Sequence, residues 1–279
     1  MTKILVTGAK GMLGQDLCPI LQDEGFDVTE TDVDTLDITD AGMVKEVLSA
    51  NKPSIVIHCA AYTNVDKAEE DLETATKINV NGTENLARVC GENGITLVYI
   101  STDYVFDGTK GEKYLPTDTP NPINNYGLTK YQGEEAVRKY CKKYYITRTS
   151  WLYGIHGKNF VETMISLADK PELKVVDDQI GCPTWTVELA NGIVELIEDD
   201  AEYGTYHVCG SGVTSWYGFA KEIFEQSGLK VNLKPCTTDE FPRPASRPGY
   251  SAMDNSGLCR DWKAALKNYM ALRPEGAIV

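Results

Sequence analysis

The sequence predicts an α/β protein with a doubly wound parallel sheet and a smaller C-terminal domain. Three observations support this fold class. Short β-branched segments alternate with helical segments over the first 150 residues, which is typical of a parallel sheet covered by helices on both faces. The first of these segments runs directly into a glycine-rich turn, GAKGMLG. After about residue 151 the alternation weakens, and prolines and glycines separate shorter elements.

The chain begins with the pattern of a buried strand that opens into glycines. Residues 3–7, KILVT, form a short β-branched run of the kind found in parallel sheets. Gly8, Gly11 and Gly14 follow, and leucine or isoleucine then recurs at positions 13, 17, 20 and 21, as in a helix. Such a turn brings backbone N–H groups and a helix N-terminus close to a pyrophosphate. The spacing is G-x-x-G-x-x-G rather than the usual G-x-G-x-x-G, so the turn alone also fits an ordinary strand–helix connection.

An acidic residue supports the dinucleotide interpretation. A second strand is expected at 27–31, and Asp32 follows it directly. A carboxylate at this place holds a ribose hydroxyl in dinucleotide-binding folds. Strand, glycines, helix, strand and acid in this order favour a Rossmann-like cofactor site over a simple turn.

The remainder of the first half continues the alternation. Strands are expected at 55–60, 96–101 and 144–149, helices at about 40–51, at about 68–92 and around positions 126–130, and a loop rich in Gly, Pro, Asp and Asn at 103–125. The ligands of such a sheet gather at the carboxyl ends of its strands.

The C-terminal part is expected to form a smaller lid domain. Helices are expected at about 158–169, 186–198 and 215–227. The expected division is a dinucleotide-binding domain at 1–155 and mainly the lid at 156–279, with 171–200 returning to the main sheet. The segment 234–251 holds four prolines together with Arg243 and Arg247. A segment this stiff suits folding over a ligand, although a solvated linker is an equal alternative.

Composition favours a globular cytoplasmic protein and disfavours several other classes. The chain has 279 residues, of which 42% are hydrophobic and 24% charged, as is ordinary for globular domains. A formal charge of −14 argues against a nucleic-acid partner, although a few local cations can still bind an anionic substrate. No run approaches the ~18 apolar residues of a membrane span, and the N-terminus does not read as a signal peptide. The eight cysteines form no C-x-x-C pair and are interpreted as reduced core thiols rather than metal ligands or disulfides.

Tyr126 and Lys130 are the strongest catalytic candidates. They stand four residues apart, so on a helix both side chains lie on one face. A tyrosine with its ordinary pKa near 10 is a poor acid at neutral pH. A nearby cation favours the phenolate, lowers that pKa and makes the hydroxyl a usable proton donor. The alternative is an amphipathic helix with a surface lysine and a half-buried tyrosine.

The chain resembles the extended short-chain dehydrogenase/reductases, and most closely the dTDP-4-dehydrorhamnose reductases among them, over essentially its whole length. The matching segments include ILVTGAKGMLG, HCAAYTNVDKAE, STDYVFDG, NNYGLTKYQGE, TRTSWLYG, DQIGCPT and RPASRPGYSAMDNSGL. The resemblance implies reduction by NADPH or NADH of the C4 ketone of dTDP-4-dehydro-6-deoxy-L-mannose. The expected product is dTDP-L-rhamnose, and the expected assembly is a monomer or homodimer.

The resemblance also implies roles for individual residues. The expected catalytic residues are Thr102, Tyr126 and Lys130. The expected cofactor-binding residues are Gly8, Gly11, Met12, Leu13 and Gly14 for the pyrophosphate, Asp32 for the adenosine ribose, Asp37 and Ile38 for the adenine, Ala60, Ala61 and Tyr62 along the cofactor channel, and Tyr126 and Lys130 at the nicotinamide ribose. The expected substrate-binding residues are Asp103, Tyr104, Trp151 and Arg247.

Three alternatives remain open at this point. Nucleotide-sugar dehydratases of the same superfamily carry an Asp-Glu pair after the active-site threonine, whereas here Asp103 is followed by Tyr104. Related epimerases are harder to separate by spacing. The third alternative is a non-catalytic subunit like the regulatory subunit of methionine adenosyltransferase, which loss of the Tyr or Lys would favour; both are present.

Magnesium is a weakly supported addition. Relatives sometimes dimerise around Mg²⁺ held by acidic residues, and Asp16 and Glu188 lie near where such ligands occur. Gln15 and a shifted register weaken this correspondence, so an acidic surface pair is the favoured interpretation and no metal ligands are assigned.

Overall fold

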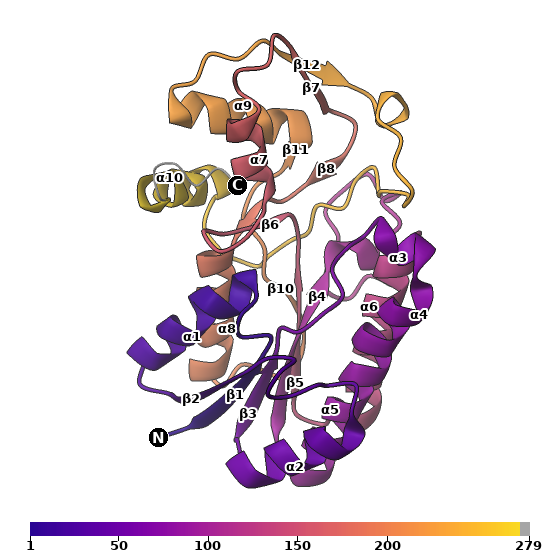
Figure 1. Ribbon diagram of the computed structural model, residues 1–279, viewed down its shortest axis with the longest axis vertical. Helices are drawn as coiled ribbons and strands as arrows, with labels where there is room; N and C mark the ends of the chain where they lie inside the picture. The colour runs from indigo at the N-terminus through magenta and orange to yellow at the C-terminus, as the bar shows by residue number, and fades with distance from the viewer. Residues whose placement is uncertain (274–279) are drawn as a thin grey trace.

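The computed structural model describes residues 1–273, and within them the largest sheet has six parallel strands. The strands are β1 Lys3–Thr7, β2 Asp27–Thr31, β3 Ile55–His58, β4 Thr96–Thr102, β5 Tyr144–Thr149 and β10 Gly204–His207. Their spatial order is β10-β5-β4-β3-β1-β2 (Figure 1). The chain therefore turns from β1 to β2 on one side and places β3 on the other side of β1. This reversal is the point at which doubly wound sheets bind ligands.

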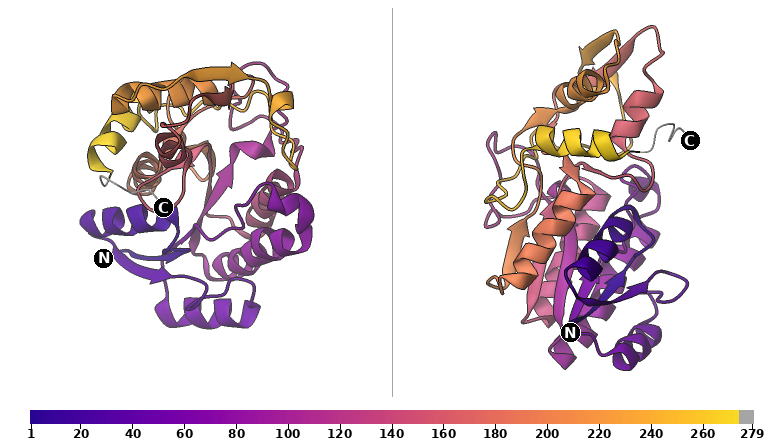
Figure 2. Two further views of the ribbon diagram at one scale, coloured as in Figure 1. Left: turned by 45° about the horizontal axis from the view of Figure 1, so that its top comes forward. Right: turned by 90° about the vertical axis from the view of Figure 1, so that its left-hand side faces the viewer.

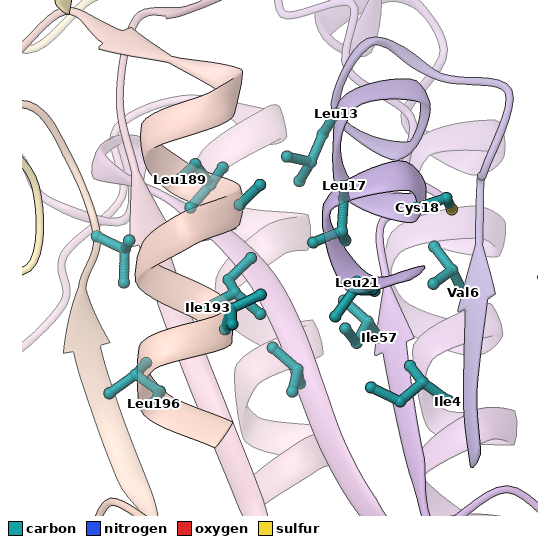
Figure 3. Close-up of a cluster of buried hydrophobic side chains, with 14 of the residues drawn as sticks. Ile4, Val6, Leu13, Leu17, Cys18, Leu21, Ile57, Leu189, Ile193 and Leu196 are labelled. Atoms are coloured by element: carbon teal, nitrogen blue, oxygen red, sulfur yellow. The ribbon is translucent and has the colours of Figure 1, made fainter. Parts of the chain in front are cut away.

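Alternate side chains of each strand pack against helices on opposite faces of the sheet. Ile4 and Val6 belong to a cluster with helices α1 Met12–Asp23 and α8 Thr186–Glu198 (Figure 3). Leu5, between them, belongs to the cluster that holds α2 Ala41–Asn51, α5 Thr83–Asn93 and α6 Asn125–Tyr140. This period of two is why a buried strand reads as an unbroken apolar run.

The helix expected over 68–92 is not continuous. It consists of α3 Lys67–Glu70, α4 Leu72–Thr76, a π-helical turn η1 at Lys77–Gly82 and α5. The wide turn contains Asn79, whose amide bonds both the N–H and the carbonyl of Tyr62 and the hydroxyl of Thr129. Asn79 thereby ties this helical stretch to the loop after β3 and to α6, and π-turns of this kind are frequent at functional sites.

The C-terminal part packs around its own apolar cluster above the carboxyl ends of the strands (Figures 1 and 2). Its helices are α7 Phe160–Ser166, α9 Trp216–Ser227 and α10 Trp262–Leu272, with a short 3-10 turn η3 at Thr238–Glu240. A similar turn, η2 Asp103–Val105, follows β4 in the first half of the chain. Its small sheets pair β6 Leu152–Tyr153 with β9 Thr184–Trp185, β7 Leu173–Val176 with β12 Leu233–Cys236, and β8 Ile180–Gly181 with β11 Thr214–Ser215. Helices were expected near α7, α8 and α9, whereas α10 was not foreseen.

Two elements from the second half of the chain pack with the first half. Helix α8 lies against α1, and β10 pairs with β5 at the edge of the main sheet (Figure 1). The segment 173–185, which precedes α8, forms strands of the small sheets instead. The exact division into two domains stays a prediction, and its last residues, 274–279, lie outside the described part of the chain. No helix within residues 1–273 is both long and apolar enough to cross a membrane.

Candidate active site

A cavity of about 1030 Å³ opens at the carboxyl ends of five neighbouring strands. Residues that end or follow β1, β2, β3, β4 and β5 all line it, as the strand order predicts. The C-terminal part contributes Lys158 and Trp216 to its wall. The lining includes these residues singled out from the sequence: Gly8, Gly11, Met12, Leu13, Gly14, Asp32, Asp37, Ile38, Ala60, Ala61, Thr102, Asp103, Tyr104, Tyr126, Lys130 and Trp151.

The glycine turn is too tightly packed to accept side chains. Gly8 has a φ of +67°, and a Cβ atom there would lie 2.7 Å from the backbone nitrogen of Ala60. A Cβ atom on Gly14 would lie 2.5 Å from the carbonyl oxygen of Gly8. Helix α1 begins directly after Gly11, and no side chain of the described residues caps it. Its first N–H groups are thus left for an anion, so the residues present fit a dinucleotide pyrophosphate.

Acidic side chains surround the part of the cavity beyond β2. Asp32 accepts a hydrogen bond from the backbone N–H of Lys10 at 3.0 Å, and the Lys10 ammonium lies 2.6 Å from Asp34. Asp37 accepts from the N–H and hydroxyl of Thr39, and these bonds lower the pKa of its carboxyl. Lys77 also lines this region and acts on Asp37, so two cations and three carboxylates lie where the sequence predicts the adenosine end of a cofactor.

Thr102 and Tyr126 meet because helix α6 sits unusually close to the end of β4. Asn124 caps the helix by accepting from the N–H of Gly127. A Cβ atom on Gly127 would lie 2.1 Å from the carbonyl oxygen of Tyr104, so only glycine permits this approach. Thr102 and Tyr126 both line the cavity as a result; burial raises the pKa of Tyr126, and the nearby Thr102 hydroxyl lowers it in part.

The protonation of the Tyr–Lys pair differs from the sequence expectation. Burial lowers the pKa of Lys130 to about 7 and raises the pKa of Tyr126 to about 12. The Lys130 ammonium lies 4.1 Å from the centre of the Tyr99 ring. The pKa of the tyrosine is therefore raised rather than lowered, because burial disfavours both charged forms and the nearby Asp103 opposes a phenolate.

Two tryptophans form the wall contributed by the C-terminal part. The rings of Trp151 and Trp216 stack with centroids 3.6 Å apart and planes 9° from parallel. Trp151 has a φ of +48°, a strained value for a non-glycine residue. The Trp151 ring also fills the space over Gly181, where a Cβ atom would lie 2.5 Å from it. A strained backbone of this kind persists only where the surrounding packing holds it in place. Such strain is often found at ligand-binding sites, so this wall is a candidate ligand contact.

Arg247 does not line the cavity itself but lies beside a residue that does. Its guanidinium donates to Asp66 and to the carbonyl of Ala245, both at 2.5 Å, and it lies close to Tyr104, which lines the cavity. Arg247 itself is outside the lining, and its side chain is mostly buried. Tyr62 is also outside the lining, with its backbone held by Asn79 and its hydroxyl without a hydrogen-bond partner among the described residues.

A family model described as the RmlD substrate binding domain matches residues 1–272. The chain belongs to this family. It is similar to the spore coat polysaccharide biosynthesis protein SpsK of Bacillus subtilis, at 42% identity over 98% of each chain. It is also similar to the crystal structure of a dTDP-4-dehydrorhamnose reductase from Clostridium acetobutylicum, at 47% identity and a TM-score of 0.94, covering 97% of this chain and 99% of the other.

A further solved structure in this RmlD family carries a cofactor. The dTDP-4-dehydrorhamnose reductase of Bacillus anthracis, in complex with NADP, is 44% identical, with a TM-score of 0.93 over 97% of this chain and 99% of the other. The family resemblance read from the sequence and the doubly wound α/β fold class are both confirmed.

Several residues of the site in this RmlD family member were not identified from the sequence. Lining residues from loops or remote elements include Val33, Thr63, Thr74, Lys77, Ser150, Lys158 and Trp216. Trp216 is the clearest case, because it follows Trp151 by 65 positions and meets it only through tertiary packing. The sequence did offer one indication: Trp216 is a large aromatic residue in the first turn of an expected helix, at 215–227.

The acidic pair considered for magnesium is buried, which corrects the expectation of a surface pair. Asp16 accepts from the Thr186 hydroxyl and lies 3.4 Å from His156, while Glu188 is bonded by Arg260. Among residues 1–273, no group of three or more His, Cys, Asp and Glu side chains gathers in a way that could hold a metal ion.

Proposed function

We propose that this protein uses NADPH or NADH to reduce the C4 ketone of dTDP-4-dehydro-6-deoxy-L-mannose to dTDP-L-rhamnose. The observation that carries this proposal is that Thr102, Tyr126 and Lys130 line the same cavity as the glycine turn, with helix α6 packed closely on the end of β4. One end of that cavity suits a dinucleotide and the other has room for a second ligand. Its volume of about 1030 Å³ is at the upper end of the range for small-molecule sites.

The cofactor would be held by the residues around the first three strands. Gly8, Gly11 and Gly14 would face the pyrophosphate, with Met12 and Leu13 in the first turn of α1. Asp32 would accept from the adenosine ribose, Asp37 and Ile38 would line the adenine, and Ala60 and Ala61 would line the channel. A bound NADPH or NADH supplies the hydride.

Tyr126 would donate the proton that the reduced ketone oxygen requires. With a pKa raised to about 12, its phenol carries a proton at neutral pH and begins in the donor form. Negative charge grows on the ketone oxygen during reduction, and the oxygen then becomes basic enough to take that proton. Thr102 would supply a second hydrogen bond to the same oxygen. A positioned acid of this kind contributes roughly 10²–10⁴ in rate.

Lys130 would bind the nicotinamide ribose and assist proton return to Tyr126. Burial leaves its pKa at about 7, so it can gain and lose a proton at neutral pH. A pKa near the working pH is common among groups that transfer protons in enzymes.

The C-terminal part would act as the substrate-binding lid. Trp151 and Trp216 offer an aromatic wall, and Lys158 adds a cation to the lining. Arg247, beside Tyr104, is the second cation near this wall. These two charges would attract a nucleoside diphosphate to a protein whose formal charge is −14.

The proposed activity is tested by mixing the purified protein with the keto sugar and either reduced cofactor. Stoichiometric oxidation of the cofactor with formation of dTDP-L-rhamnose is expected. The 3,5-epimer, dTDP-4-dehydro-6-deoxy-D-glucose, should react more slowly. Isomerisation of the sugar without net cofactor oxidation would instead indicate an epimerase, and no reaction with any keto sugar would favour the non-catalytic alternative.

We expect both NADPH and NADH to work, within about 10³-fold of each other in kcat/KM. Asp32 repels a 2′-phosphate and accepts from a 2′-hydroxyl, which favours NADH. Lys10 lies beside it and opposes that preference, although Asp34 partly neutralises its charge. Lys10→Ala should lower kcat/KM for NADPH more than for NADH. Asp34→Ala, which leaves the Lys10 charge unneutralised, should shift the preference toward NADPH. Steady-state kinetics with both cofactors checks this; a discrimination above about 10³ in the native protein contradicts it.

Arg247→Ala is expected to raise KM for the nucleotide sugar by about 10- to 150-fold. This range corresponds to losing a hydrogen bond to a charged group, about 1.5–3 kcal/mol. Cofactor affinity should barely change, because Arg247 lies outside the cofactor end of the cavity.

Arg243→Ala is the matched control for Arg247→Ala. Arg243 lies on the same segment, 3.9 Å from the same Asp66, but is half exposed and should have little effect on KM. Equal weakening of sugar and cofactor by Arg247→Ala would mean that the arginine supports the fold through Asp66. Unchanged KM would remove it from the substrate site.

A further inference from the structure

The Thr102 hydroxyl can donate one hydrogen bond, in either of two directions. Its oxygen accepts from the backbone N–H of Tyr104 at 3.2 Å, and it lies 3.1 Å from a carboxyl oxygen of Asp103. It also lies near the phenol of Tyr126, and both residues line the cavity. A hydroxyl offers one hydrogen and two lone pairs. The hydrogen therefore points either to Asp103 or into the cavity.

Asp103 is placed so that its charge decides between these directions. It is 2% exposed, and its second carboxyl oxygen accepts from the Ser251 hydroxyl at 2.5 Å. Burial raises its pKa to about 7, against the hydrogen bonds from Ser251 and Thr102, which lower it. The titratable groups that face it are Tyr104 on its own turn, Tyr126 on α6, and Cys182 and Cys209 from the C-terminal half.

We propose that Asp103 is a positioning residue whose protonation sets the direction of the Thr102 hydrogen. An ionised Asp103 can only accept, so it draws the hydrogen out of the cavity. A protonated Asp103 donates to the Thr102 oxygen instead, which frees the Thr102 hydrogen to bond the ketone oxygen. All bonds are then satisfied, because Thr102 accepts from Asp103 and Tyr104 and donates once.

This inference rests on the proposed reductase function and predicts a pH dependence. Below the pKa of Asp103, two hydroxyls, those of Tyr126 and Thr102, can donate to the ketone oxygen. As the pH rises through that pKa, Thr102 turns away and the hydride-transfer rate falls. The loss at the high-pH limit should be about 10²-fold, the scale of removing one donor to a developing oxyanion.

Asp103→Asn is expected to abolish this decline. The amide nitrogen donates permanently to the Thr102 oxygen, while the amide oxygen still accepts from Ser251. The rate of the variant, measured in single turnovers with bound reduced cofactor and compared with its own value at pH 6, should show no decline up to pH 9. Lys130 also has a pKa of about 7, so a decline caused by Lys130 would survive in Asp103→Asn and would overturn the proposal.

A double-variant comparison separates hydrogen direction from a direct effect of charge on Tyr126. In a Thr102→Val background there is no hydroxyl to turn, so adding Asp103→Asn should leave the pH profile unchanged. An equal effect of Asp103→Asn with and without the Thr102 hydroxyl would show that the carboxylate acts on Tyr126 directly, and the proposal would be wrong.

A measurement without substrate distinguishes failure of this inference from failure of the proposed function. Carbon NMR of aspartate-labelled protein follows the Asp103 carboxyl through its titration. Thr102→Val should raise that pKa, because the ionised form loses a donor, and Ser251→Ala should do the same. An unchanged pKa in Thr102→Val overturns the inference whatever the activity. A raised pKa in a protein that reduces no keto sugar refutes only the proposed function.

Discussion

Tyr126→Phe is expected to lower turnover by about 10²-fold or more while leaving cofactor binding nearly unchanged. The change removes one oxygen, and that oxygen is the proposed proton donor, close to Thr102 within the cavity. Losses of 10²–10⁴ are typical when a positioned general acid is removed. Turnover with the keto sugar, together with cofactor affinity from nicotinamide fluorescence, checks both parts of the expectation.

Tyr131→Phe is the matched control for this change. Tyr131 lies on the same helix, directly after Lys130, but outside the lining of the cavity. The same chemical change there should leave turnover close to that of the native protein. If Tyr126→Phe kept native turnover, the assignment of the proton donor would be wrong. If it lost cofactor binding as well, the hydroxyl would be supporting the site rather than donating a proton.

Glu134→Ala is expected to destabilise the protein by about 3–5 kcal/mol. Glu134 is fully buried and accepts two hydrogen bonds from Arg148, each 2.8 Å long, with further bonds from Arg138 and Ser101. Arg148 is itself 1% exposed, so removing the carboxylate leaves a buried guanidinium without its main counter-ion. Breaking such a pair from one side costs about this much, because the remaining charge stays desolvated.

Glu135→Ala, at the next position of α6, is the control for Glu134→Ala. Glu135 is mostly exposed and pairs with Arg138 on the solvent side, so its loss should cost under about 1 kcal/mol. Urea unfolding of the three proteins measures both differences. Equal and small losses would show that the buried pair contributes little beyond a surface pair.

The Glu134–Arg148 pair also connects stability to the site. Glu134 lies one helical turn after Lys130, and Ser101 immediately precedes Thr102. The bond between Glu134 and Ser101 therefore fixes α6 against β4 beside the proposed catalytic hydroxyls. Partial loss of activity is expected in Glu134→Ala even at temperatures where it remains folded.

Local pattern was sufficient to predict five of the six strands of the main sheet and many residues that line the cavity, whereas β10 was not foreseen. Strands such as β1 and β5 appear in the sequence as apolar or β-branched runs, because both faces of a parallel sheet are covered. The glycine turn and the Tyr126–Lys130 pair lie within short segments whose spacing alone places the side chains. Their positions at the carboxyl ends of strands follow from the alternation of elements.

Contacts between distant segments could not be predicted in the same way. Arg247 and Asp66 are 181 positions apart, and nothing local in either segment indicates that they pair. The helix expected over 68–92 breaks at Asp71, and its π-helical turn contains Asn79, which bonds to Tyr62 and Thr129, 17 and 50 positions away in the sequence.

The lowered pKa of Lys130 could not be predicted from the sequence either, because it also depends on tertiary packing. Burial dominates it, and burial is a property of the whole fold. The sequence indicated that a cation would accompany the tyrosine, whereas the structure buries that lysine and thereby lowers its pKa to about 7.

The most direct test of the proposed function follows the hydride itself. The protein is incubated with dTDP-4-dehydro-6-deoxy-L-mannose and NADPH that carries deuterium at both C4 positions of the dihydronicotinamide. The reductase proposal predicts dTDP-L-rhamnose with one deuterium at sugar C4, one for each cofactor molecule oxidised. Product without deuterium at C4, or no oxidation of either NADPH or NADH in the presence of the sugar, would contradict it.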